Sequence, residues 1–226
     1  MELIIFYGLA GISLLITLGA QAYINSCYSK YKKVNTEKGL TGEEVARKLL
    51  DKHGLQDIKV QQVSGTLSDH YDPKGRVIRL SQDIFSKSTV AAVSVACHEC
   101  GHAIQDKNNF VFLRIRSSLV PVVNLCSYAG YAAIILGGIL SMMGLIWAGI
   151  IAEMVILLFQ LVTLPVEFDA SKRGLKEVKE EGFLNATELK GGKKMLTSAA
   201  LTYVASVATA IIQVLRLVLI YGRRND

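Results

Sequence analysis

Three long stretches without a charged side chain constrain this chain most strongly. They cover residues 3–24, 117–152 and 195–215. About 20 consecutive apolar residues cross the hydrocarbon core of a bilayer as a helix. The first and last stretches therefore predict one span each, and the middle stretch, which continues past Glu153 to Val166, is long enough for two. Residues that permit a tight turn lie within it: Gly137, Gly138, Ser141 and Gly144.

These stretches divide the chain into five segments. We predict a first transmembrane helix at residues 1–24, a hydrophilic segment at 25–116 and a transmembrane helical hairpin at 117–166. A second hydrophilic segment covers residues 167–194, and a last transmembrane or re-entrant helix covers 195–222. The fold class expected is a mainly α integral membrane protein with about four transmembrane helices.

The positive charges indicate how such a protein is oriented. The net charge is +6, with fifteen Lys and Arg in residues 27–116, seven in 172–194 and none before the first span. Cytoplasmic loops carry the excess of these residues. We therefore expect a multi-pass protein of the cell membrane, with its N-terminus outside and both hydrophilic segments in the cytoplasm. Arg223 and Arg224 conflict with this pattern, so the orientation of the last span is left open.

This distribution also bears on partners. Basic residues close to predicted spans are typical of contacts with anionic lipid, so we expect the bilayer, and no nucleic acid, as their partner. An oligomer or a regulatory membrane partner is compatible with the sequence.

A short motif in the first hydrophilic segment suggests chemistry. His98-Glu99-Cys100-Gly101-His102 has the pattern H-E-x-x-H. On a helix, two histidines four residues apart lie on one face and can bind one Zn²⁺, while the glutamate can take a proton from a zinc-activated water. Glu99 is the candidate general base, and His98 and His102 are candidate metal ligands.

A catalytic zinc site needs a third protein ligand and an open position. Glu167 is the strongest candidate, because it follows Pro165 at the predicted cytoplasmic end of the third span. By the charge distribution, it emerges on the same side of the membrane as His98 and His102.

Local patterns around the motif indicate a small mixed domain. Thr41 and Glu44 form a capping box that opens a helix. Alternating residues predict strands at 58–63 and 76–80, and Tyr71 to Gly75 predicts a turn. The helix of the motif is expected over residues 87–105. The strand at 76–80 is a candidate to bind an extended substrate by strand addition.

Four separate runs of the chain resemble one known family. They are the segments 71–73, 78–81, 97–103 and 165–171, with the sequences YDP, IRLS, CHECGHA and PVEFDAS. In these runs, and in the order of its spans, nearly the whole chain is similar to the bacterial neutral zinc metallopeptidases of the membrane. It is more distantly similar to heat-shock membrane metalloendopeptidases and prenyl-protein endopeptidases, in which a glutamate of an E-x-x-A-D pattern is the third ligand.

The resemblance implies a zincin-like catalytic domain of α+β structure that binds one Zn²⁺ per chain. It implies His98, His102 and Glu167 as the ligands, in the manner of gluzincins, and Glu99 as the general base. This chain has Ser171 where the distant relatives have aspartate. Either Ser171 or Asp169 is then expected to take the place of that aspartate.

The function expected is hydrolysis of peptide bonds in membrane-proximal or misfolded polypeptides, by an endopeptidase that uses zinc-activated water. A further donor should stabilise the oxyanion. His70, Tyr71 and Arg173 are candidates for this role, and the sequence does not rank them.

Three other interpretations compete with this function. The protein can be a non-catalytic, zinc-binding membrane scaffold or regulator, although structural zinc usually takes four protein ligands. It can be a metal transporter, for which Glu153, alone within a span, makes a poor site. Cys97 and Cys100 form a C-x-x-C that suggests a thiolate zinc site or a redox pair, but their position within the histidine motif favours packing.

Overall fold

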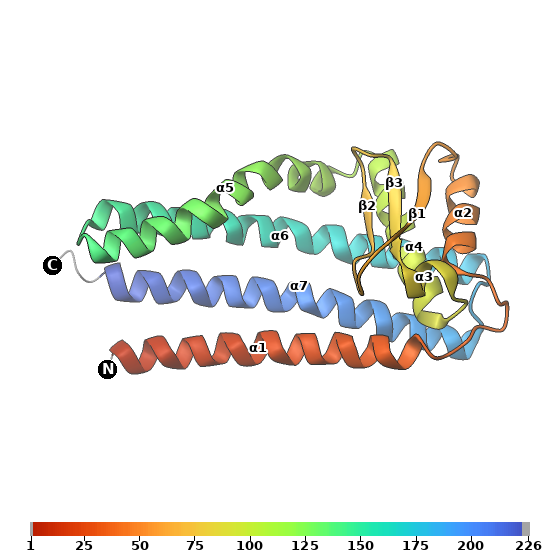
Figure 1. Cartoon of the computed structure of the whole chain (residues 1–226), viewed down its shortest axis with the longest axis horizontal. Coiled ribbons are helices and arrows are strands. Elements are labelled where there is room, and N and C mark those ends of the chain that lie inside the picture. Colours follow the sequence, from red (N-terminus) through yellow and green to blue (C-terminus); the bar gives the residue numbers. More distant parts are fainter. Residues whose placement is uncertain (1, 223–226) are drawn as a thin grey trace. The chain divides into compact units, whose positions relative to one another are not determined.

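The structure is a computed structural model that describes residues 2–222 and contains seven α-helices and three β-strands in this range (Figure 1). Arg223 and Arg224 lie outside the described residues. The helices are α1 (Glu2–Tyr31), α2 (Gly42–Lys52), α3 (Gln82–Ser86), α4 (Val90–Lys107), α5 (Val111–Ile139), α6 (Met143–Glu180) and α7 (Ala186–Tyr221). The strands are β1 (Lys59–Val63), β2 (His70–Asp72) and β3 (Val77–Ser81).

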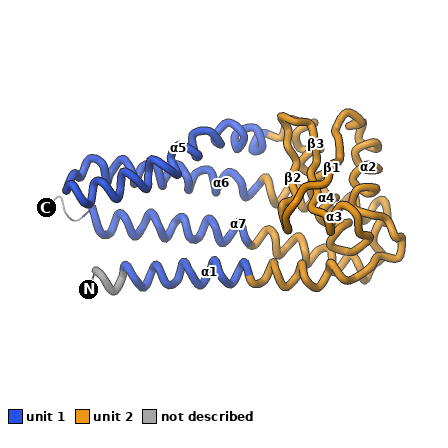
Figure 2. The backbone as a smooth tube through the Cα atoms, viewed as in Figure 1, with its two compact units in different colours: residues 1–21, 111–165, 202–226 blue, residues 22–110, 166–201 orange. Residues whose placement is uncertain are grey.

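The chain divides into two compact units, each of which contains parts of α1, α6 and α7 (Figure 2). Unit 1 consists of Met1–Gln21, Val111–Pro165 and Thr202–Asp226. Unit 2 consists of Ala22–Phe110 and Val166–Leu201. The predicted spans contribute most of unit 1, and the two predicted hydrophilic segments contribute most of unit 2.

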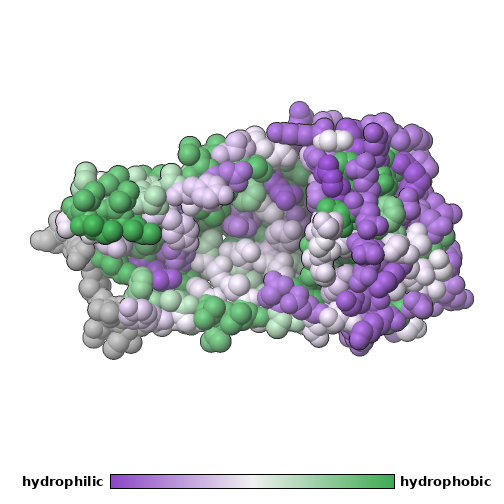
Figure 3. Space-filling view, in the orientation of Figure 1, coloured by the Kyte–Doolittle hydropathy of each residue, from purple (hydrophilic) through white to green (hydrophobic). Residues whose placement is uncertain are grey.

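Four helices are long and apolar enough to cross a membrane. They contain the candidate spans Phe6–Tyr31, Val111–Ile139, Met143–Glu180 and Ala186–Tyr221. The protein is thus mainly α, with the four candidate spans that the uncharged stretches predict. Hydrophobic side chains gather on the helices of unit 1, whereas hydrophilic ones gather on unit 2 over the strands and α2 (Figure 3).

Small residues let α5 and α6 pack closely within unit 1. A Cβ atom on Gly149 would lie 2.8 Å from the carbonyl oxygen of Gly130, so only glycine fits at this contact. Close approach through small residues is how membrane helices gain van der Waals contact. The turn between these helices lies at residues 140–142, where Ser141 has a φ of 53°. The predicted turn of the hairpin is therefore present.

Three polar side chains of unit 1, Glu153, Gln213 and Arg216, lie within the candidate spans. Arg216 donates from Nη1 to Oε1 of Gln213 at 3.0 Å, and its guanidinium lies 4.1 Å from the ring centroid of Phe6. The buried Oε1 atom of Glu153 has no hydrogen-bond partner among the described residues. Arg216 and Gln213 thus pair with each other, and this hydrogen bond does not include Oε1 of Glu153.

The sheet of unit 2 differs from the sequence prediction in one strand. Its order is β1-β3-β2, with β1 parallel to β3 and β2 antiparallel to β3. β3, the strand predicted to bind substrate, is central and has a neighbour on both sides, so that prediction is wrong. The predicted turn is present, and Asp72 Oδ1 accepts from the backbone N–H groups of Lys74 and Gly75 at 3.0 Å. This turn closes a β2–β3 hairpin whose first strand was not predicted.

The core of unit 2 forms around α4, which is buried along most of its length. The predicted capping box starts α2: Thr41 Oγ1 accepts from the backbone N–H of Glu44, and Glu44 Oε2 accepts from that of Thr41. Leu49 and Leu50 of α2 then pack into the same core as Ile78 and Leu80 of β3. The capped, amphipathic α2 and the sheet thereby enclose the helix of the motif.

Two helices continue across the predicted segment boundaries at residues 166–167 and 194–195. α6 runs through Pro165, and α7 runs through Gly191 and Gly192. A Cβ on Gly191 would lie 2.7 Å from the ring of Tyr31, and one on Gly192 would lie 2.7 Å from Ser94 Oγ. These glycines therefore serve helix packing inside unit 2 and do not end the helix.

Candidate metal centre

The two histidines of the motif lie on one face of α4. This helix begins after Thr89, whose Oγ1 accepts from the backbone N–H of Ala92 at 3.2 Å as an N-cap. His98 and His102 are one turn apart, as the spacing predicts, and their ring centroids are 4.8 Å apart. Both rings therefore present a nitrogen to the same point in space.

Glu167 of α6 meets these two rings. Its Oε2 lies 3.3 Å from Nε2 of His98 and 3.6 Å from Nε2 of His102. The three ligand atoms all lie within 4.8 Å of one another, and they form the one group of this kind among the described residues. The side chain of Glu167 is only 3% exposed, so the carboxylate is held away from bulk water. The structure thus brings together the three predicted ligands.

Two glycines allow α4 and α6 to approach this closely. A Cβ on Gly101 would lie 2.5 Å from the carbonyl oxygen of Ala170, and one on Gly174 would lie 2.9 Å from that of Cys97. Any larger residue would push the helices apart, because both contacts are to backbone atoms. Gly101 therefore matters although it stands at a variable position of the H-E-x-x-H pattern.

In each histidine, the Nδ1 atom, which faces away from Glu167, contacts a different polar residue. The distance from His98 Nδ1 to Ser171 Oγ is 3.1 Å, and that from His102 Nδ1 to Gln105 Oε1 is 3.0 Å. We assign the proton of each ring to Nδ1, where both oxygens accept it. This tautomer leaves the Nε2 lone pair of each ring directed at the carboxylate of Glu167.

Asp169 acts on the site through Gln105. Gln105 Nε2 donates to Asp169 Oδ2 and to the carbonyl oxygen of Val166, both at 2.8 Å. Arg173 Nε donates to the same Asp169 oxygen at 2.5 Å. Of the two alternatives for the missing aspartate, Ser171 contacts His98 directly, whereas Asp169 reaches His102 only through Gln105. Gln105 was not singled out from the sequence, since a glutamine on a helix carries no distinctive pattern.

Glu99 is buried next to the ligands. Burial raises its pKa to about 7, the negative charges of Glu167 and Asp69 act in the same direction, and His98 opposes them only in its protonated form. The backbone N–H of Tyr71 in β2 donates a hydrogen bond to this carboxylate. A carboxyl group poised near neutral pH can accept a proton and later return it.

The three candidates for the oxyanion donor are all engaged elsewhere. The Tyr71 hydroxyl donates to Asp106 Oδ2 at 2.8 Å, and Arg173 is bound to Asp169. His70 is exposed, with Nδ1 2.8 Å from the carbonyl oxygen of Ser68 and Nε2 3.3 Å from Arg79 Nη1. The structure does not bring any of these donors into contact with the three ligands.

Cys97 and Cys100 play a packing role. Both are buried free thiols, and Cys100 Sγ donates to the carbonyl oxygen of Ala46 at 3.6 Å. Burial raises the pKa of both thiols, which disfavours the thiolate form that binds metal. Neither cysteine joins the group of ligand atoms formed by His98, His102 and Glu167.

This donor set fits zinc. Two neutral imidazoles and one carboxylate are common ligands of Zn²⁺, and three protein ligands leave the fourth tetrahedral position open. A purely structural site usually has four protein ligands. The geometry therefore corresponds to a site at which a small molecule can bind the metal.

Comparison with known proteins agrees with this arrangement. Residues 6–222 match the model of a family described as "Putative neutral zinc metallopeptidase". The chain belongs to this family. It is 42% identical to the "Putative membrane protease YugP" of Bacillus subtilis (strain 168) over 224 residues, which cover 99% of each chain. No solved structure matches it significantly.

Family membership has two direct consequences. The family is one of zinc metallopeptidases, so zinc is the metal that the trio of ligands is expected to hold. Together with the four apolar helices, the relative described as a membrane protease supports location in a membrane. The family resemblance inferred from the sequence motifs is confirmed.

Proposed function

We propose that this protein is a zinc-dependent endopeptidase that hydrolyses peptide bonds of membrane-proximal or misfolded polypeptides. The observation that carries the proposal is the meeting of His98, His102 and Glu167 beside the buried carboxylate of Glu99. Three ligands, an open position and an adjacent base are the parts that hydrolytic zinc chemistry needs.

In the proposed reaction, different residues would bind the metal, orient its ligands and transfer the proton. His98, His102 and Glu167 hold the metal, and Ser171 and Gln105 fix the two rings in the orientation for binding. A Zn²⁺ ion held by these residues would supply polarisation of the substrate carbonyl and a water of lowered pKa. Glu99 takes a proton from that water and passes it to the nitrogen of the scissile bond. The amine can then leave as a neutral group.

The substrate would bind in extended form along β2. This strand forms one edge of the sheet, and its Tyr71 N–H already reaches Glu99. Pairing along an edge strand fixes a peptide through main-chain hydrogen bonds, and it needs no particular side-chain sequence. Such recognition suits misfolded or unwound polypeptides, whose main chain is free. The positive charges of residues 27–116 and 172–194 support an active site at the cytoplasmic face with the N-terminus outside.

The test compares zinc content and cleavage in the purified full-length protein. Wild type, Glu99→Gln, His102→Ala and Glu167→Ala would be incubated with unfolded casein, with and without a chelator, and the products identified by mass spectrometry. We expect Glu99→Gln to keep its zinc and lose cleavage, and the two ligand variants to lose both. Internal cleavage products would identify an endopeptidase. Undiminished cleavage by Glu99→Gln would refute the role of the base.

A matched control separates these effects from a general loss of charge. Glu180 lies on α6 like Glu167, but it is exposed and far along the helix from the ligands. Glu180→Gln should keep both zinc and activity. A wild-type protein that binds zinc but cleaves no polypeptide would instead favour the scaffold or regulator.

A further inference from the structure

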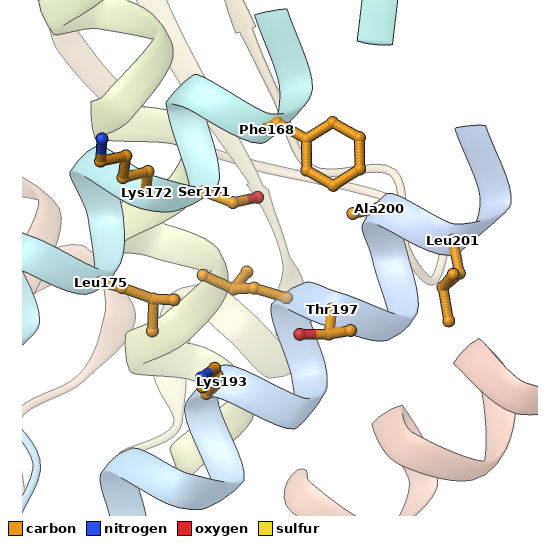
Figure 4. Close-up of a pocket in the computed structure, with 9 residues that line it drawn as sticks. Phe168, Ser171, Lys172, Leu175, Lys193, Thr197, Ala200 and Leu201 are labelled. Carbon is orange, nitrogen blue, oxygen red and sulfur yellow. The ribbon is translucent and has the colours of Figure 1, made fainter. Parts of the chain in front are cut away.

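A cavity on unit 2 lies between the facing sides of α6 and α7 (Figure 4). Its volume is about 290 Å³, at the lower end of the range of ligand sites. Apolar side chains form most of its wall: Phe168 and Leu175 from α6, and Leu196, Ala200 and Leu201 from α7. We call it the α6–α7 pocket. Such a wall favours an apolar occupant over water.

One end of the pocket is more apolar than the other. Phe168 points toward Ala200, and these residues, with Leu201, lie at the end where α6 and α7 enter unit 2 (Figure 4). Phe168 and Leu201 are 50% and 42% exposed, which is unfavourable for large apolar side chains in water. Both helices are long and apolar enough to cross a membrane, and along each of them this end of the pocket is the part next to the segment that belongs to unit 1.

Two lysines flank the remainder of the pocket. The stem of Lys172 lines it while the ammonium group points outward, and Lys193 lies at the end opposite Phe168 (Figure 4). Both are exposed, and no carboxylate oxygen of the described residues lies within 4.0 Å of either ammonium. The nearby Asp169 is already bound to Arg173 and Gln105. The rim thus offers two positive charges without partners.

We propose that the α6–α7 pocket binds an anionic phospholipid of the surrounding bilayer. One acyl chain occupies the apolar wall beside Phe168 and Ala200, and the phosphate lies at Lys172 and Lys193. Basic pockets between membrane helices bind anionic headgroups in this way, and lysines place their stems along apolar surface with the charge at the interface. The proposal is independent of peptidase activity.

A lipid explains the lining better than a substrate side chain does. The pocket and the metal centre share Ser171, but this residue is 9% exposed and its hydroxyl is turned to His98. Ser171 therefore separates the two sites. None of the three metal ligands lines the pocket, whereas the exposed Phe168 and Leu201 make its apolar end accessible to a lipid.

Native mass spectrometry of the full-length protein tests the headgroup contact. The protein in neutral detergent would be incubated with phosphatidylglycerol or with phosphatidylcholine that carries the same acyl chains. We expect wild type to retain phosphatidylglycerol with a preference of about tenfold or more, since each lysine near an anionic surface contributes to binding. The double variant Lys172→Gln/Lys193→Gln should lose this preference.

Matched variants keep the result specific. Lys179→Gln/Lys194→Gln removes two exposed lysines from the same helices that do not line the pocket, and it should bind like wild type. Ala200→Phe fills the apolar wall and should reduce retention of both lipids. Equal retention of both lipids by wild type, or equal loss in both double variants, would overturn the proposal.

A photo-crosslinker identifies the occupant in membranes. Thr197 lines the pocket and is exposed, so Thr197→benzoylphenylalanine should crosslink to lipid. Crosslinks to a polypeptide or to a second copy of this chain, with none to lipid, would overturn the proposal. Circular dichroism of each variant distinguishes loss of the site from loss of the fold.

Discussion

Gln105 and Asp169 join the two helices of the metal centre, with Gln105 Nε2 donating to Asp169 Oδ2 at 2.8 Å. The same amide presents its oxygen to Nδ1 of His102 at 3.0 Å, so an acid on α6 orients a ligand on α4 through one intermediate side chain. Gln105 is fully buried, and both ends of its amide are satisfied. A metal site built this way should depend on residues that never touch the metal.

Replacing Gln105 by leucine should therefore weaken zinc binding without removing a ligand. The variant loses the acceptor that fixes His102 and leaves the carboxylate of Asp169 with one donor fewer. Loss of such a partner typically lowers metal affinity by about 10- to 100-fold. Competition with a zinc chelator measures the change. Gln62→Leu, at an exposed position of β1, is the control and should bind zinc like wild type.

Ser171, which contacts the other histidine, gives a second prediction for zinc affinity. Ser171→Ala removes the oxygen 3.1 Å from His98 Nδ1 and should also weaken zinc binding. Ser171→Asp places a carboxylate there, which holds the Nδ1 proton more strongly and makes the ring a better ligand. The affinity for zinc should therefore follow the order Asp, Ser, Ala at this position. An alanine variant that binds zinc as tightly as wild type would exclude a positioning role for Ser171.

Local patterns were sufficient for much of the fold. Uncharged stretches predict the candidate spans, because only length and polarity decide whether a helix suits a bilayer. Thr41 and Glu44 predict the start of α2, since both halves of a capping box lie within one turn. The spacing of His98 and His102 predicts a shared helix face for the same reason. In each case the partners are close in sequence.

Features that depend on tertiary contact were not predictable in this way. β2 has only three residues, and its pairing with β3 decides its conformation. The role of Gln105 depends on Val166 and Asp169, which lie far away in the sequence. Pro165 suggested a boundary, but α6 continues through it. The central position of β3 follows from the order of the sheet, which the sequence of one strand does not contain.

Gly101 is predicted to control the stability of unit 2. In Gly101→Ala the new Cβ would meet the carbonyl oxygen of Ala170 at 2.5 Å, so α4 and α6 must move apart. Overpacking of this kind costs about 1–3 kcal/mol. The variant should melt at a lower temperature and bind zinc more weakly, because Glu167 moves away from the histidines. Gly144→Ala, on α6 with no atom within 4 Å of the added Cβ, is the control and should leave both unchanged.

Glu99 should reduce the stability of the metal-free protein at high pH. Its pKa is raised by burial from 4.5 to about 7 in the folded chain, so folding favours the protonated form. Both states are protonated below the unfolded pKa of about 4.5, and stability is then lost progressively as the pH rises from there through about 7. Above that pH the buried charge costs on the order of 3 kcal/mol.

Glu99→Gln removes this cost, since the amide stays neutral at every pH and keeps an oxygen to accept from Tyr71 N–H. In chelator-treated protein, the variant should therefore melt above wild type at pH 8, and the difference should shrink toward zero near pH 4. Thermal melts across this range measure it, with Glu180→Gln as the exposed control. A difference in melting temperature that does not change with pH would mean that the substitution acts through packing and not through the charge of Glu99. The charged carboxylate of Glu99 would then carry no electrostatic cost in the folded chain. That result would contradict the cost expected from its burial beside Glu167.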